Sequence, residues 1–142
     1  MACEIVSTQG AVFALWGKPE RLDFDRVIDA LQSAANAVGH PVLYLTRVPI
    51  DAPAPDAEAR ARLSELMPGI TAVCSSYHVV LEGDGFAAAM KRGILTGLFQ
   101  LNWRRKTFFV HASVEDVAKH VTGNDQRALT AILRAAAANQ LL

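Results

Sequence analysis

Histidines and a cysteine–serine run are the residues of this chain best suited to chemistry. The four histidines, His40, His78, His111 and His120, show none of the close spacings, such as HxH or HExxH, at which metal ligands usually converge. His78 and His111 fall in two separate apolar runs, so neighbouring strands could bring them together. We nevertheless expect no metal and no cofactor, and interpret the histidines as surface groups or hydrogen-bonded strand ends.

Cys74-Ser75-Ser76 places candidate nucleophiles directly before the apolar run 77–81. A catalytic serine or cysteine needs a base within hydrogen-bond distance and donors for an oxyanion. No GxSxG elbow surrounds this triplet, and nothing in the neighbouring sequence supplies the base. We therefore interpret Cys74 as a buried thiol and both serines as strand-edge residues, and we predict no catalytic residues and no enzymatic activity.

Two further segments carry glycines or charges that suggest a ligand. Gly83-Asp84-Gly85 lacks the GxGxxG repeat and the lysine of a phosphate-binding loop, and the Asp84 carboxylate would repel a phosphate. The basic cluster 103–106 lies where we expect a helix to end, and cations are favoured there. Because acids and bases balance at 14 each, the chain as a whole indicates neither nucleic-acid binding nor attraction to a membrane surface.

The segment 49–56, PIDAPAPD, is a loop stiffened by three prolines. Its acids, Asp51 and Asp56, are candidate site residues, because ligands of open α/β sheets tend to bind at the carboxyl ends of strands. The structural alternative is a rigid connection in which Asp56 caps the next helix.

The apolar periodicity predicts one α/β domain over residues 1–142, built on a mixed, mostly parallel sheet with helices packed on it. An N-terminal hairpin of strands 4–7 and 11–16 precedes strands 41–48, 77–81 and 107–111. The expected helices run from Asp23 to Val38, from Asp56 to Pro68-Gly69, over 86–101, from Ser113 to Val121 and over 125–139. Residues 70–74 are expected to be extended, either as an early start of the following strand or as a separate piece.

The helix expected over 86–101 is apolar almost all round, so it is either deeply packed or part of an interface. Gly93 and Gly97 share one face of it and favour close approach by the sheet or by a second chain. The candidate interface or pocket residues are Phe86, Met90, Gly93, Gly97, Phe99, Trp103 and Phe108.

The predicted order, β-β-α-β-α-β-α-β-α, resembles the STAS fold of anti-sigma-factor antagonists, the SpoIIAA-like domains. The resemblance rests on the order of elements over nearly the whole chain. In that family, partner switching depends on a serine at the start of the helix after the third strand. The matching stretch here, 50–56, contains no serine, threonine or glycine. The resemblance therefore implies an STAS-like scaffold without the phosphorylation switch.

We expect this domain to act in bacterial regulation by protein–protein interaction, with a protein partner and as a homodimer. The alternative is a small-molecule or lipid-binding module with an apolar pocket between the 86–101 helix and the sheet. An enzyme using Asp51, Asp56 or Cys74 ranks third. The start of the chain does not resemble a signal peptide and no apolar run reaches membrane length, so we expect a cytoplasmic protein with no membrane partner.

Overall fold

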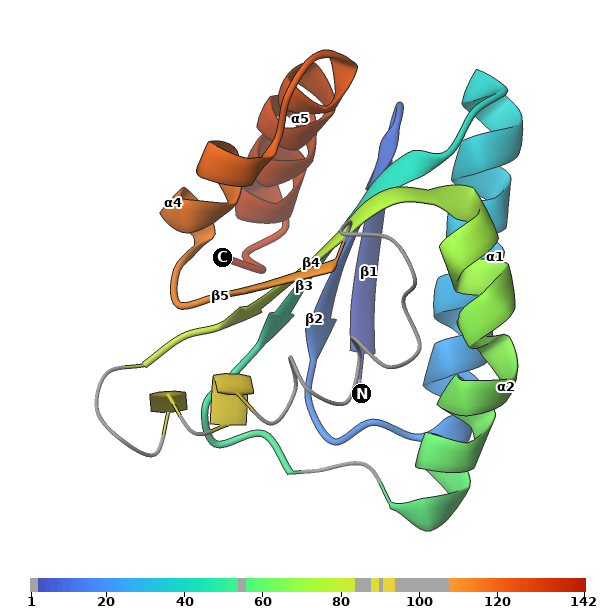
Figure 1. Ribbon diagram of the computed structural model, residues 1–142, viewed down its shortest axis with the longest axis vertical. Helices are drawn as coiled ribbons and strands as arrows, with labels where there is room; N and C mark the ends of the chain where they lie inside the picture. The colour runs from blue at the N-terminus through green and yellow to red at the C-terminus, as the bar shows by residue number, and fades with distance from the viewer. Residues whose placement is uncertain (1–2, 54–55, 84–87, 90, 94–107) are drawn as a thin grey trace.

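A mixed five-stranded sheet forms the frame of the molecule (Figure 1). The computed structural model describes residues 3–53, 56–83, 88–89, 91–93 and 108–142. Strands β1 and β2 form an antiparallel hairpin, and the pairs β2–β3, β3–β4 and β4–β5 are parallel. The strands are β1 (Cys3–Thr8), β2 (Ala11–Trp16), β3 (Val42–Val48), β4 (Cys74–Leu81) and β5 (Phe108–His111), in that spatial order. This arrangement confirms the predicted fold class and the N-terminal hairpin.

Helices cover both faces of the sheet. Figure 1 shows α1 (Arg21–Val38) and α2 (Ala57–Val73) on one side. On the other side lie α4 (Val114–Val117), the 3₁₀ turn η1 (Ala118–His120) and α5 (Asn124–Ala138). Residues of β2 alternate between the two cores: Val12 and Ala14 pack toward α1 and α2, whereas Ala11 and Phe13 pack toward α5.

Helix α1 begins two residues before the predicted Asp23, because Glu20 acts as its N-cap. The Glu20 side chain accepts from the backbone of Asp23, and the Asp23 carboxylate accepts from the Glu20 N–H at 3.0 Å. This reciprocal capping box satisfies two backbone donors at the helix start. Gly39 ends the helix as predicted, with a φ of 75° that favours glycine.

The predicted end of α2 at Pro68-Gly69 is wrong, as is the extended conformation predicted for 70–73. The helix continues through Pro68 to Val73. A proline in a helix interior costs about 3 kcal/mol. Burial of Ile70, which is only 2% exposed, offsets that cost by roughly 1.5–3 kcal/mol. Gly69 fits closely against α1, since a Cβ at this position would lie 3.4 Å from Ile28 Cδ1.

The helix expected over 86–101 is described at Ala88, Ala89 and 91–93, which are helical. Lys91 Nζ donates to the carbonyl of Ile50 at 2.8 Å, and Arg92 Nη1 donates to the carbonyls of Leu81 and Gly83 at 3.0 Å each. These bonds hold the segment at the carboxyl ends of β3 and β4. The predicted interface residues Phe86, Met90, Gly97, Phe99 and Trp103 lie outside the described residues.

No helix in the described parts of the chain combines the length and the apolar character needed to cross a bilayer.

Asp56 caps α2, as the sequence predicts, through a hydrogen bond of 2.8 Å from the Ala59 N–H to its carboxylate. We expect Asp56→Ala to lower the free energy of unfolding by about 1 kcal/mol, because it leaves that donor without its acceptor. Urea denaturation followed by circular dichroism measures the change.

Asp51→Ala is the matched control, because Asp51 is an exposed acid of the same loop outside the helix. Its stability should stay within about 0.5 kcal/mol of the parent protein. An equal loss in both variants would contradict the capping role.

Candidate functional site

A pair of buried histidines lies between β4 and β5, on the face that α4 and η1 cover. His78 has no exposed surface and His111 is 5% exposed. The two rings lie on the same face of neighbouring strands, and Nδ1 of His78 is 2.9 Å from Nε2 of His111. Burial of two imidazoles side by side requires that they satisfy each other's hydrogen bonds, because water does not reach them.

Ser76 extends this pair into a chain of three side chains. Its hydroxyl lies 3.0 Å from Nε2 of His78, so both ring nitrogens of His78 have partners. If Ser76 donates to Nε2, then His78 Nδ1–H donates to Nε2 of His111. The reverse arrangement fits the same distances: Nε2–H of His111 donates to Nδ1 of His78, and Nε2–H of His78 donates to the Ser76 hydroxyl. In both directions each contact holds one proton and both rings are neutral.

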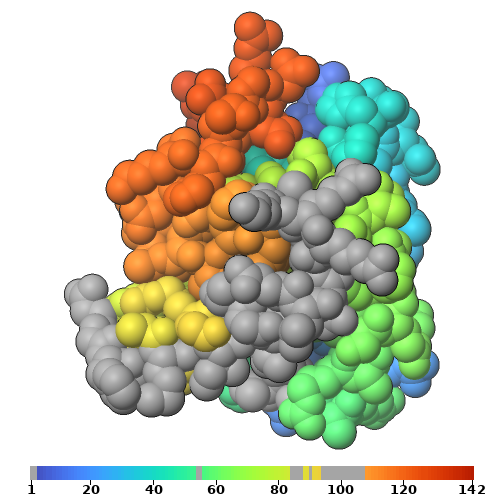
Figure 2. Space-filling model, viewed as in Figure 1, coloured from blue at the N-terminus to red at the C-terminus, as the bar shows by residue number. Residues whose placement is uncertain are grey.

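Aromatic rings enclose the histidines. The Phe109 ring stacks on His78, with centroids 5.0 Å apart and an interplanar angle of 8°. His120 of η1 lies against His111 and Phe109, with centroids 5.1 Å and 5.0 Å away, and its Nδ1 contacts the carbonyl of Asp116 at 3.3 Å. Figure 2 shows the orange atoms of β5 and α4 side by side on one face of the molecule. His120 therefore connects the buried pair to the exposed surface.

Burial decides the charge of the pair. It lowers the pKa of His78 from 6.5 to about 3, and the positive forms of His111 and His120 lower it further. Burial and His120 lower the pKa of His111 to about 4, although the Asp116 carboxylate acts in the opposite direction. Both rings are therefore neutral at neutral pH.

The interpretation of these two histidines as surface groups or strand ends is wrong for His78, which is buried in the interior of β4. The two histidines do lie on neighbouring strands, as their positions in two apolar runs, YHVVL and FFVH, allow. Within the described ranges, no three His, Cys, Asp or Glu side chains are placed to hold a metal ion.

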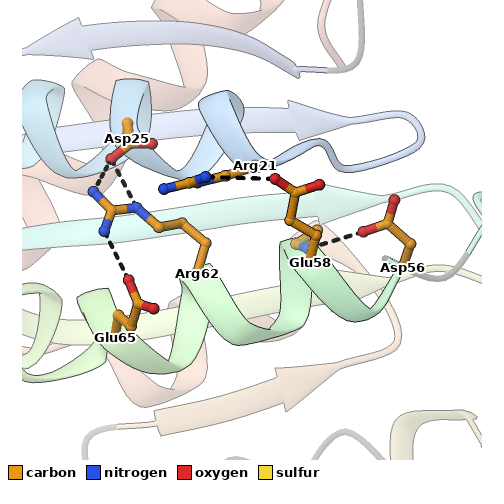
Figure 3. Close-up of polar contacts among 7 residues, drawn as sticks. Arg21, Asp25, Asp56, Glu58, Arg62 and Glu65 are labelled. Carbon is orange, nitrogen blue, oxygen red and sulfur yellow. Dashed lines mark hydrogen bonds and ion pairs between the residues drawn. The ribbon is translucent and has the colours of Figure 1, made fainter.

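A second polar region is an open groove where α1 and α2 begin, with a volume of about 490 Å³. Figure 3 shows two ion pairs that join the helices there: Arg21 to Glu58 at 3.4 Å, and Arg62 to Asp25. The Arg62 hydrogen bond holds the pKa of the Asp25 carboxyl below its usual range. The groove is lined by Lys18, Glu20, Arg21, Leu22, Asp25, Asp56 and Glu58.

The structure separates the predicted site residues rather than bringing them together. Asp56 lines the groove and caps α2, whereas Asp51 lies exposed on the loop. Phe108 is buried in the α1–α2 core, edge-on to Tyr77 with ring centroids 5.2 Å apart. Gly93 is exposed, and, apart from its own neighbours in the chain, no described atom lies within 4 Å of the position that a Cβ would take.

Cys74 is buried, as the sequence predicts, and burial raises the pKa of its thiol to about 12. Since the thiolate is the reactive form of cysteine, this environment suits packing rather than nucleophilic attack.

Comparison of the chain with protein-family models, with curated proteins and with solved structures finds no match in any of the three.

The histidine pair predicts how stability depends on pH. Both pKa values are lower in the folded protein than the usual 6.5, so the unfolded chain binds more protons between about pH 6.5 and pH 4. Stability is therefore complete above pH 6.5 and falls as the pH decreases, by up to about 1.4 kcal/mol per pH unit for each histidine. Urea denaturation at pH 7.5, 6.0 and 5.0 measures this slope.

His111→Gln should roughly halve the slope, since one of the two titrating rings is removed. His40→Gln, which changes an exposed histidine, is the control and should leave the slope unchanged. A parent protein whose stability is constant from pH 7.5 to pH 5.0 would show that the pair is not held neutral by burial.

Proposed function

We propose that the protein is a binding domain, an STAS-like scaffold that acts through protein–protein contacts and first of all with a second copy of itself. The mixed sheet with its N-terminal hairpin is compatible with that scaffold. The contact surface is the groove at the start of α1 and α2.

The observation that carries this proposal is the exposure of Leu22. It lies in the first turn of α1 within the groove, and 71% of its surface is exposed. Charged side chains surround it, among them Arg21 and Glu58. An apolar centre with a polar rim is the usual anatomy of a protein interface.

The charges of the groove favour a second copy as the occupant. Lys18 and Arg21 lie on the same surface as Glu20 and Glu58. In a two-fold symmetric contact the same patch meets itself, so a patch with both signs of charge can be self-complementary. The Arg21–Glu58 pair has side chains that are 55% and 70% exposed, which leaves both accessible to partners across such a contact.

The loop that precedes α2 belongs to the same end of the molecule. Because the stretch 50–56 has no serine or threonine, the proposed contact is not switched by phosphorylation there. Dimer formation would then depend on the concentration of the protein. A regulatory role in bacteria would arise if another protein competed with the second copy for this groove.

We expect the parent protein to form a dimer at micromolar concentration and Leu22→Asp to raise the dimer dissociation constant at least about tenfold. Each copy loses one buried leucine, worth about 1.5–3 kcal/mol, and about 1.4 kcal/mol already corresponds to a factor of ten. Sedimentation equilibrium over a range of protein concentrations measures the constant.

Leu142→Asp is the matched control, because Leu142 is 43% exposed and lies outside the groove. It should leave the dimer unchanged. A monomer at every concentration, or a dimer that only Leu142→Asp weakens, would reject the groove as the interface.

A further inference from the structure

A β-bulge in β4 sets the direction of two neighbouring serines. Val42 of β3 pairs with Cys74, but the next residue, Leu43, pairs with Ser76, so Ser75 is an extra residue in β4. Successive residues of a regular strand point to opposite faces. Here Ser75 donates to the carboxylate of Asp125 in α5 at 2.9 Å, while Ser76 contacts His78. Bulges of this kind re-aim side chains and are frequent beside active sites.

Next to the bulge, the side chains of Ser76, His78 and His111 contact one another in a row. Ser76 is half-buried, His78 lies behind it with no exposed surface, and His111 contacts the far nitrogen of His78. A hydroxyl, a base within 3.0 Å, and a third group that orients the base form the arrangement that activates serine for acyl transfer.

The second histidine gives the proton a path away from the serine. When Ser76 transfers its proton to Nε2 of His78, the Nδ1 proton of His78 can pass to Nε2 of His111. His111 is the less deeply buried of the two rings, 5% exposed against none for His78, and the Asp116 carboxylate favours its protonated form, although burial and His120 oppose it more strongly. The buried ring of His78 therefore need not keep the charge.

We propose that Ser76 is a nucleophile that accepts an acyl group from small activated esters or thioesters. Its Oγ forms a bond to the acyl carbon, and the bond from that carbon to the leaving alcohol or thiol breaks. The proton of Ser76 passes through His78 to the leaving group, and water later releases the acid by the same path in reverse.

The first turn of α5 lies beside this site, because Asp125 from that turn accepts the hydrogen bond of Ser75. The N-cap residue of α5, Gly123, has no side chain to bond the N–H groups of the turn. The N–H of Gln126 bonds the Gly123 carbonyl at 3.1 Å, so the N–H groups of Asn124 and Asp125 are the donors we assign to the negative oxygen that forms during acyl transfer.

The test treats the full chain with p-nitrophenyl acetate and, separately, with an alkyl fluorophosphonate at pH 7.5. We expect a burst of nitrophenolate, one adduct per chain by intact mass, and peptide mapping that places the adduct on Ser76. Ser76→Ala should abolish both, whereas Ser75→Ala should retain them, because Ser75 bonds Asp125 and no histidine.

His78→Gln should lower the labelling rate at least about tenfold, because it removes the ring nitrogen that lies 3.0 Å from the Ser76 hydroxyl; a base with a pKa of about 3 contributes less than one matched to pH 7.5. If that variant does not fold, His111→Gln replaces it as the test and should lower the rate about tenfold or more, because it leaves the base in place without its orienting partner. Circular dichroism checks the fold of each variant.

The pH profile separates this site from a surface serine that reacts by chance. Because His78 and His111 are neutral down to about pH 4, the labelling rate should change less than about twofold between pH 8 and 5.5.

No adduct, an adduct elsewhere, or equal labelling of the parent protein and Ser76→Ala would overturn the proposal. The Leu22→Asp variant should label at the parental rate, so failure of the dimer and failure of this site are distinguishable.

Discussion

The hydrogen bond between His78 and His111 satisfies two polar rings inside a sheet that is covered on both faces. His78 has no access to water, so each of its nitrogens must find a partner in the protein. One partner comes from β5 and the other from β4 itself. An unsatisfied buried polar group costs about 1–3 kcal/mol, so this bond favours the register of β5 against β4 in which the two rings meet.

The same burial that makes the pair necessary also limits its chemistry. A desolvated imidazole binds a proton weakly, and positive charge on the neighbouring histidines lowers the pKa of His78 further. The hydrogen bond to His111 gives that proton a second place, on a ring whose protonated form the Asp116 carboxylate favours and His120 opposes. The stability of the fold at low pH and the reactivity of Ser76 are therefore two consequences of one arrangement.

The two candidate surfaces lie at opposite ends of the parallel strands. Ser76 lies near the start of β4, whereas the groove follows the ends of β2 and β3. Among the described strands the order β1-β2-β3-β4-β5 never reverses, so they contain no switch point of the kind at which α/β proteins usually form a crevice. The groove instead arises where α1 and α2 begin side by side, and the ion pairs of Arg21 and Arg62 join the two helices there (Figure 3).

Local sequence determined the elements whose signals are local: the hairpin around Gly10, the end of α1 at Gly39 and the cap of α2 at Asp56. Each depends on the conformation or hydrogen bond of a few adjacent residues. Tertiary structure decided the rest. Packing of Ile70 against the core carries α2 past Pro68, and strand pairing across 33 residues brings His78 to His111. Neither contact has a signature within a short stretch of chain, because the energy that favours it exists only once the sheet has formed.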